Sequence, residues 1–207
     1  FKEIHIWGNE KILDRINENE NIVKHYEKYL KSNNANSILS YFYRIYWHIF
    51  LLKKNIRKNN CDLVFFPGSY NLSGINNYVC INLNILPFEK SLLKKIGLNL
   101  KYFKFKLLKY LYQSAYKNSQ GVIFLSNLAK KLIYNEHKLL NKNFTVIPLG
   151  LKNSFYKLNE IPSVKKKYIK IIYVSPFDFY KNQINVFFAI EQLSRKYNIK
   201  IYFIGSG

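Results

Sequence analysis

Hydrophobic positions in the carboxyl-terminal part of the chain change their period twice, and this change predicts a strand, a helix and a second strand. Tyr168–Val174 is β-branched or aromatic at nearly every position, as in a parallel strand that is covered on both faces. From Lys181-Asn182-Gln183 onward, the apolar side chains recur at helical spacing. A second apolar run, Ile199–Ile204, follows the helix. The pattern predicts one βαβ unit whose two strands end at the same edge.

The residues after these two strands are small or polar. Ser175 and Pro176 end the first strand, and Gly205-Ser206-Gly207 ends the second. Open α/β sheets bind ligands at the carboxyl ends of their strands, and a lysine beside such a crevice suits a phosphate. Lys181 is therefore a candidate anion-binding residue. The simpler interpretation is a solvated lysine, but a cation at the positive end of a helix is unfavourable without an anion nearby.

Alternating strands and helices are also predicted in the rest of the chain. Apolar runs predict strands at Glu3–Trp7, near Ile22 and Val23, and at Asp62–Phe66, Tyr78–Leu83, Gly121–Leu125 and Phe144–Ile147. Helices are predicted over Glu10–Ile16, from Ser37 to about Lys58, from Pro87, over Leu100–Tyr116, and from Ser126 to about Leu140. This alternation indicates an α/β fold with a parallel sheet.

Two of the predicted helices are rich in aromatic residues. Leu100–Tyr116 interleaves lysines with aromatic and aliphatic side chains. This mixture fits a helix on an anionic lipid leaflet, a solvated face over a core, or a surface for single-stranded nucleic acid. In the other helix, Arg44 and His48 interrupt the apolar run Tyr41–Leu52, which is too short to span a membrane. A buried helix or one on a membrane surface is preferred there.

Five segments, in order and spacing, resemble glycosyltransferase family 4, whose members are retaining transferases with two Rossmann-like domains. The segments are CDLVFFPG at Cys61–Gly68, NLNILPFE at Asn82–Glu89, GVIFLSNLAKK at Gly121–Lys131, VIPLG at Val146–Gly150, and the βαβ unit ending in Gly-Ser-Gly. The resemblance covers nearly the whole chain and is to members that build bacterial surface polysaccharide such as O-antigen and capsule. It implies an α/β fold of the GT-B type. Residues 1–148 would then form the acceptor-side domain without its start, 149–167 the interdomain linker, and 168–207 the beginning of a truncated nucleotide-sugar-binding domain.

The resemblance also implies an activity and a set of residues. Such an enzyme transfers a sugar from a nucleotide-diphosphate sugar to a saccharide or lipid-linked saccharide, with retention of configuration and without a metal or other cofactor. Lys181 is the catalytic candidate, because it would neutralise the leaving diphosphate. The donor-binding candidates are Ser175, Lys181, Asn182, Gly205 and Ser206, and the acceptor-binding candidates are Gly68, Asn84, Glu89 and Ser126. The expected location is the cytoplasm or the inner face of the plasma membrane, and nucleic acid is not an expected partner.

The chain departs from the family pattern at two positions. Pro176 stands where the family usually has an arginine, and Leu83-Asn84 where many members have a His-Asp pair. Asparagine can hydrogen-bond a sugar hydroxyl but cannot act as a base. Glu89 is the nearest carboxylate, although its simpler role is in the first turn of a helix, and the simpler role of Ser126 is a helix cap. The family's glutamate pair would lie beyond the last residue, and its glycine-rich loop would lie before Phe1. We therefore expect a fragment that lacks both ends and is inactive alone.

The charge leaves two alternative functions open. Lys and Arg number 33 against 12 Asp and Glu, for a formal net charge of +21, which implies a polyanionic partner or an anionic surface. The abundance of Lys, Asn and Ile beside few arginines indicates instead an A/T-rich coding bias. The alternatives to a transferase are a basic protein that binds nucleic acid or another polyanion, and a nucleotide-sugar-binding protein that transfers nothing.

Other chemistry lacks a motif in this sequence. Cys61 and Cys80 both fall in apolar segments, so we expect two buried free thiols in strands. The four histidines show no metal-ligand spacing, and no acidic cluster joins them. GxSxG, the P-loop motif and GxGxxG are all missing from the 207 residues, so hydrolase, nucleoside triphosphatase and dehydrogenase functions have no support.

Overall fold

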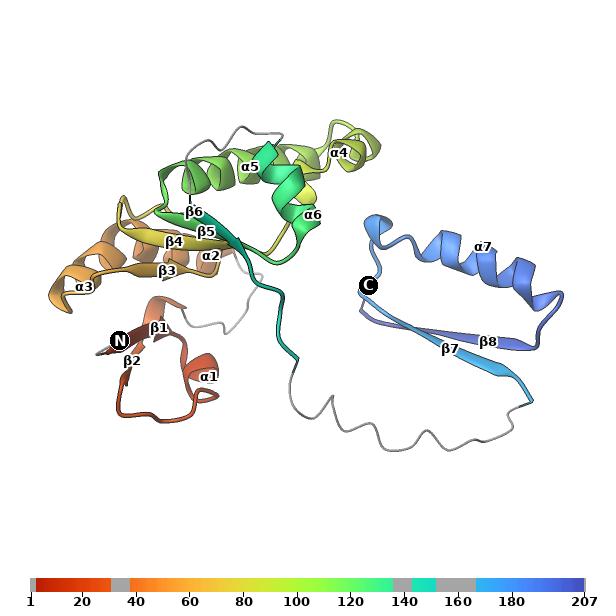
Figure 1. Ribbon diagram of the computed structural model, residues 1–207, viewed down its shortest axis with the longest axis horizontal. Coiled ribbons are helices and arrows are strands. Elements are labelled where there is room, and N and C mark those ends of the chain that lie inside the picture. Colours follow the sequence, from red (N-terminus) through yellow and green to blue (C-terminus); the bar gives the residue numbers. More distant parts are fainter. Residues whose placement is uncertain (1–2, 31–37, 136–142, 152–166, 207) are drawn as a thin grey trace. The chain divides into compact units, whose positions relative to one another are not determined.

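The computed structural model describes residues 3–30, 38–135, 143–151 and 167–206 of the chain. The chain divides into two compact units, Phe1–Leu149 and Gly150–Gly207 (Figure 1). The predicted interdomain linker, 149–167, falls mainly outside the described residues. Within those residues both units are mixed α/β, and all strand pairs are parallel, which confirms the predicted fold class at this level.

The first unit is built on a four-stranded parallel sheet in the order β3-β4-β5-β6. Its strands are β3 (Val64–Phe66), β4 (Tyr78–Asn82), β5 (Gly121–Phe124) and β6 (Asn143–Val146). A smaller parallel sheet pairs β1 (Ile4–Gly8) with β2 (Ile22–Tyr26), and α1 (Glu10–Leu13) and the 3-10 turn η1 (Lys28–Leu30) accompany it. Because neighbouring strands run the same way, the carboxyl ends of β3, β4 and β5 lie at one edge of the larger sheet.

Helices connect and cover these strands. The helix predicted from Ser37 is present as α2 (Ile38–Tyr46), the π-helical turn η2 (Trp47–Leu51) and α3 (Leu52–Lys58), while Ser37 itself lies outside the described residues. Further along are the 3-10 turn η3 (Leu86–Phe88), α4 (Lys90–Ile96), α5 (Leu100–Asn118), α6 (Asn127–Lys130) and the π-helical turn η4 (Lys131–Asn135). Helix α1 is shorter than predicted, since it ends at Leu13.

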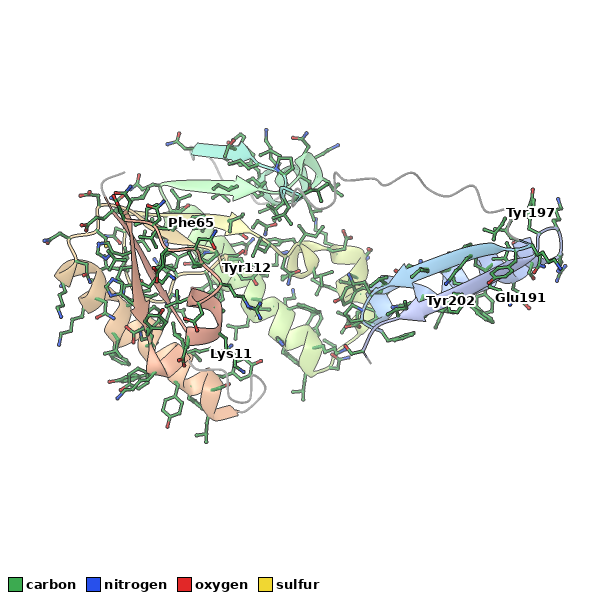
Figure 2. All side chains as sticks on the ribbon, turned by 90° about the horizontal axis from the view of Figure 1, so that it is seen from below. Lys11, Phe65, Tyr112, Glu191, Tyr197 and Tyr202 are labelled. Atoms are coloured by element: carbon green, nitrogen blue, oxygen red, sulfur yellow. The ribbon has the colours of Figure 1, made fainter. Side chains whose placement is uncertain are left out.

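The core of the first unit is strongly aromatic. Helix α5 buries Tyr112 (Figure 2). The same helix buries Tyr116, which is fully enclosed together with Phe88 and Phe124. The Tyr78 hydroxyl of β4 donates a hydrogen bond of 2.7 Å to the carbonyl of Ala115, and burial raises the pKa of Tyr78 to about 12. Helix and sheet are therefore joined by a buried polar contact as well as by ring packing.

The two cysteines differ from the prediction in one respect. Cys80 is buried in β4 as predicted, and burial raises the pKa of its thiol to about 11. Cys61 is wrongly predicted, because it is only half-buried and lies between α3 and β3, outside any strand. Its amide donates to the carbonyl of Ile56 at 3.2 Å, which closes the end of α3. The apolar segment that contains Cys61 is thus longer than β3, which begins only at Val64.

The second unit contains a single βαβ element. Strand β7 (Ile169–Val174) pairs in parallel with β8 (Ile199–Ile204), in register from Ile169 with Ile199 to Val174 with Ile204. Between them come the 3-10 turn η6 (Phe179–Lys181) and α7 (Gln183–Ser194), which lies along one face of the strand pair (Figure 1). The predicted order of strand, helix and strand is confirmed.

The prediction that β7 is covered on both faces is wrong. Side chains toward α7, such as Tyr173 and Phe203, are half-buried, whereas the alternating positions Val174 and Tyr202 (Figure 2) are exposed, with Val174 at 74%. Successive side chains of a strand point to opposite faces, and α7 covers one face only. The composition of a strand indicates that both of its faces can be buried. Burial of the second face also requires another element to lie against it.

Replacing His48 with phenylalanine is expected to make the first unit less sensitive to acid. The His48 ring of η2 stacks on Phe66 at 5.4 Å between centroids, and burial lowers its pKa below the ordinary 6.5. The unfolded chain therefore takes up a proton below about pH 6.5 that the folded chain resists, so the neutral ring stabilises the fold above that pH and this contribution is lost as the pH falls through the lower, folded pKa. The measurement is the urea midpoint at about pH 7.5 and about pH 5.5, on either side of the ordinary histidine pKa.

The midpoints of the wild-type protein should differ more between these two conditions than those of His48→Phe. Some pH dependence remains in the variant, because burial also lowers the pKa of His25. An unchanged difference between the two conditions would show that His48 does not contribute.

Candidate functional site

The loops after β7 and β8 lie side by side at the carboxyl edge of the second unit. The Ser175 amide donates to the carbonyl of Ile204, and the Phe177 amide donates to the carbonyl of Ser206, both at 2.9 Å. A Cβ atom added to Gly205 would overlap the backbone carbonyl of Ser175, so only glycine permits this approach. Three of the predicted donor-binding residues, Ser175, Gly205 and Ser206, are therefore brought together.

Lys181 and Asn182 form the turn that leads into α7. Lys181 ends η6, and its carbonyl accepts a hydrogen bond of 2.6 Å from the Tyr173 hydroxyl, which ties the turn to β7. Asn182 adopts the left-handed conformation, with φ of 62°, and its Oδ1 accepts from Asn185 Nδ2 at 2.8 Å. The helix begins at Gln183 and not at Lys181, because the left-handed residue separates it from the preceding turn.

A pocket of about 710 Å³ opens beside this turn. Its lining residues are Phe177, Asp178, Phe179, Asn182, Gln183, Ile184, Asn185, Phe187 and Phe203. Aromatic walls with a few amide groups suit a flat, neutral ring that carries hydrogen-bonding edges. The Asp178 carboxylate is the only acidic group of that lining, and it disfavours a phosphate inside the pocket.

Lys181 does not line this pocket. Its ammonium lies over the ring of Tyr180, 5.3 Å from the centroid, and the residue is half-buried. Of the predicted donor-binding residues, only Asn182 belongs to the lining. The pocket and Lys181 therefore both lie at η6 and the start of α7. The joined loops after β7 and β8 belong to the same carboxyl edge.

The predicted acceptor-binding residues follow the strands of the first unit. Gly68, Asn84 and Ser126 come after β3, β4 and β5, so the parallel sheet brings them to one edge, while Glu89 follows η3. An alanine Cβ at Gly68 would meet no atom within 4 Å, so this turn is open. None of the four residues lines the pocket beside α7 or a second pocket between α4 and α5.

Three of these residues have local structural roles. Asn84 Oδ1 accepts from the Leu86 amide at 3.0 Å, which opens η3. Glu89 caps α4 through the amide and hydroxyl of Ser91, and Ser126 caps α6 through the amide of Ala129 at 3.1 Å. The predicted capping role of Ser126 is confirmed. Glu89 is the N-cap residue of α4 and not, as predicted, a residue of the first helical turn.

A buried polar network lies at the end of β4 and was not predicted from the sequence. Asn82 is 2% exposed, and its Nδ2 donates to the Tyr116 hydroxyl at 2.7 Å and to the carbonyl of Asn84 at 3.2 Å. Ser69 Oγ donates to the carbonyl of Ile81 at 2.6 Å. Together these bonds hold the turns after β3 and β4. The available signal is an asparagine inside an otherwise apolar strand, since buried amides need partners.

The small sheet of the first unit carries a histidine pair. His5 Nδ1 lies 2.9 Å from His25 Nε2, and Glu3 lies 3.3 Å from the other nitrogen of His5. The Trp7 ring stacks on His25 with centroids 4.8 Å apart, and burial lowers the pKa of His25. Among the described residues, no group of three or more His, Cys, Asp or Glu side chains could hold a metal ion.

Comparisons with known proteins do not narrow these possibilities. The chain matches no protein-family model and no curated protein. Across the ranges that the structure describes, no helix combines the length and the hydrophobicity that crossing a bilayer requires.

Proposed function

We propose that the chain has the function of a glycosyltransferase of the GT-B type, in which the second unit binds a nucleotide-diphosphate sugar. The observation that carries the proposal is the junction of the loops after β7 and β8, which Gly205 makes possible. Open α/β sheets bind ligands in the crevice outside the carboxyl ends of their strands, and this junction lies at such an edge. The resemblance to glycosyltransferase family 4 covers the same residues and supports this interpretation.

The charges at this edge suggest which part of the nucleotide-diphosphate sugar each group binds. The aromatic and amide-lined pocket beside α7 takes the base or the ribose, because Asp178 disfavours phosphate there. Lys181 neutralises the diphosphate, since the amides of Ser175 and Phe177 already bond to Ile204 and Ser206. Charge stabilisation of a leaving diphosphate, together with correct placement of the two substrates, is sufficient for transfer without a protein nucleophile.

The first unit is proposed to hold a saccharide or a lipid-linked saccharide at its own carboxyl edge. Gly68 leaves space at this edge, and the Asn82 network fixes the turns that border it. The product would be an intermediate of surface polysaccharide. A general base at this edge would need a carboxylate without a structural role. Glu89, the candidate carboxylate, caps α4 instead.

Lys181→Gln is expected to weaken the binding of nucleotide-diphosphate sugars by about 10- to 100-fold, the range for losing a charged hydrogen bond. Affinities are measured by calorimetry with a panel of uridine, guanosine and cytidine sugar nucleotides. Lys196→Gln is the matched control, because Lys196 lies in the exposed turn after α7 and should bind as the wild type does.

Three outcomes would contradict the proposal. Salt-sensitive binding of oligonucleotides without any binding of sugar nucleotides would favour the polyanion-binding alternative. Equal affinity of Lys181→Gln and wild type would remove Lys181 from the site. Binding of sugar nucleotides without transfer to any acceptor would favour a nucleotide-sugar-binding protein.

A further inference from the structure

Helix α5 exposes an apolar stripe on the side opposite to its buried face. Leu100, Phe103, Leu107 and Tyr110 are 89%, 62%, 60% and 69% exposed. Their spacing of three and four residues places them in one row along the helix. The same helix buries Tyr112, Ala115 and Tyr116 against the core. A helix that only covers a core would present polar residues in this outer row, so the stripe is available to another apolar environment.

Lysines border the stripe on both sides. With about 3.6 residues per helical turn, Lys104 falls on one side of the row and Lys106 on the other. The chain contains no Asp or Glu between Glu89 and Glu136, a span that includes all of α4, α5 and α6. The positive charge here is therefore not balanced within the segment, and an apolar row with cationic margins is the composition of a helix that rests on an anionic bilayer.

A pocket of about 460 Å³ lies between α4 and α5 next to the stripe. Its lining residues are Lys90, Leu93, Lys94, Gly97, Leu98, Tyr102, Lys106 and Lys109. Four of these eight residues are lysines, and none carries a carboxylate. Two of the lysines also contact rings, since Lys106 Nζ lies 5.4 Å from the Tyr102 centroid and Lys109 Nζ 5.8 Å from the Phe88 centroid. Four lysines in a lining without an acidic residue give the pocket a positive potential, which attracts anions. Lys106 belongs to the pocket and also borders the stripe, so the two features form one surface.

We propose that this surface, formed by the outer row of α5 and the four-lysine pocket, docks the protein on an anionic phospholipid bilayer. The lysines of the pocket receive phosphate headgroups, and the row of α5 enters the boundary between headgroups and acyl chains. Leu98 is 83% exposed at the rim of the pocket and extends the apolar row toward α4. The inference concerns a partner and does not rest on the proposed transferase function.

A bilayer explains this surface better than a nucleic acid does. Single-stranded nucleic acids bind lysines together with aromatic rings on which the bases stack. The most exposed apolar side chains of the surface are instead Leu98 and Leu100, at 83% and 89%, which have no ring. A nucleic acid would leave these leucines in water, whereas the bilayer interface removes them from it.

The test is flotation of the protein with vesicles of phosphatidylcholine alone and of phosphatidylcholine with phosphatidylglycerol. We expect binding only to vesicles that contain phosphatidylglycerol, with an affinity that falls as salt is added. Lys94→Gln combined with Lys106→Gln should weaken this binding by about tenfold or more, because each lysine near an anionic surface contributes about fivefold to the affinity. Phe103→Ser combined with Leu107→Ser should also abolish or strongly weaken it, and all four positions are exposed, so folding should not change.

A matched pair of variants separates the surface from the overall charge. Lys54→Gln combined with Lys58→Gln removes the same charge from exposed positions of α3 and should bind vesicles as the wild type does. In addition, Phe103→Trp should show a blue-shifted emission when vesicles with phosphatidylglycerol are added. Equal weakening by the α3 pair would mean attraction by net charge only and would overturn the proposal.

Two further outcomes would also overturn it. One is unchanged vesicle binding in both the lysine pair and the Phe103 and Leu107 pair. The other is the absence of vesicle binding together with tight binding of a single-stranded oligonucleotide that the lysine pair weakens. Neither outcome bears on sugar nucleotides, so failure of this inference is distinguishable from failure of the proposed function.

Discussion

Replacing Gly205 with alanine is expected to separate the loops after β7 and β8 and to abolish the binding of sugar nucleotides. The added Cβ overlaps the backbone carbonyl of Ser175, and a backbone group cannot rotate away as a side chain can. The bonds from Ser175 to Ile204 and from Phe177 to Ser206 are then lost or stretched. Shifts of this kind cost about 1–3 kcal/mol, and the second unit has little buried surface with which to offset them.

Calorimetry with the nucleotide panel and amide exchange at Ser175 and Phe177 check this expectation. Exchange at both amides should accelerate in Gly205→Ala. Gly68→Ala is the matched control, because nothing lies within 4 Å of its added Cβ, and its stability and nucleotide binding should stay at the wild-type level. Slow exchange and intact binding in Gly205→Ala would mean that the two loops do not depend on each other.

Most elements of the fold were predictable because their signals are local. The run Ile199–Ile204 is β8 without any shift, and the predicted helix Leu100–Tyr116 differs from α5 by two residues at one end. Both depend on a repeat of side-chain type along a few turns or residues, which the sequence displays directly. The π-helical turn η2 could not be predicted, since widening a helix at Trp47–Leu51 depends on how its rings pack against other elements.

Burial in the second unit could not be predicted either, because it also depends on packing against other elements. Strand β7 has the composition of an interior strand, yet Val174 is exposed, because covering a face requires another layer and no local pattern states whether one is present. A sequence describes which face of an element is apolar. It does not describe what lies against that face.

The candidate site was predictable only where backbone geometry decides. A glycine after β8 and a Ser-Pro pair after β7 predicted loops at one edge of the sheet, and the structure adds that these loops hydrogen-bond to each other. The direction of the Lys181 side chain was not predictable, since it depends on the left-handed turn at Asn182 and on the neighbouring Tyr180 ring. The joined loops are therefore better defined by the backbone than the position of the Lys181 ammonium group is.

Tyr116→Ala is expected to lower the free energy of unfolding of the first unit by about 3–5 kcal/mol, the range for removing a buried aromatic ring. The ring is fully buried in α5, where it packs near Phe88 and Phe124, with centroids 6.3 Å and 6.4 Å away. Burial also raises the pKa of its hydroxyl well above the ordinary value, so the hydroxyl stays protonated and available for hydrogen bonding. Urea unfolding monitored by tyrosine fluorescence and circular dichroism measures the loss.

Tyr116→Phe isolates the polar contribution and connects it to the carboxyl edge of the first unit, the proposed acceptor edge. The ring remains, but Asn82 loses the partner at 2.7 Å, so a loss of about 1–3 kcal/mol is expected from an unsatisfied buried amide. Adding Asn82→Leu removes the amide as well and should recover much of that stability, because both polar partners are then replaced by apolar groups. The double variant should nevertheless loosen the turn at Asn84, whose carbonyl also accepts from Asn82 at 3.2 Å. Recovered stability with faster amide exchange around Asn84 would show that the buried amide of Asn82 positions this edge. If the losses of Tyr116→Phe and of Asn82→Leu alone instead add up in the double variant, the two side chains act independently.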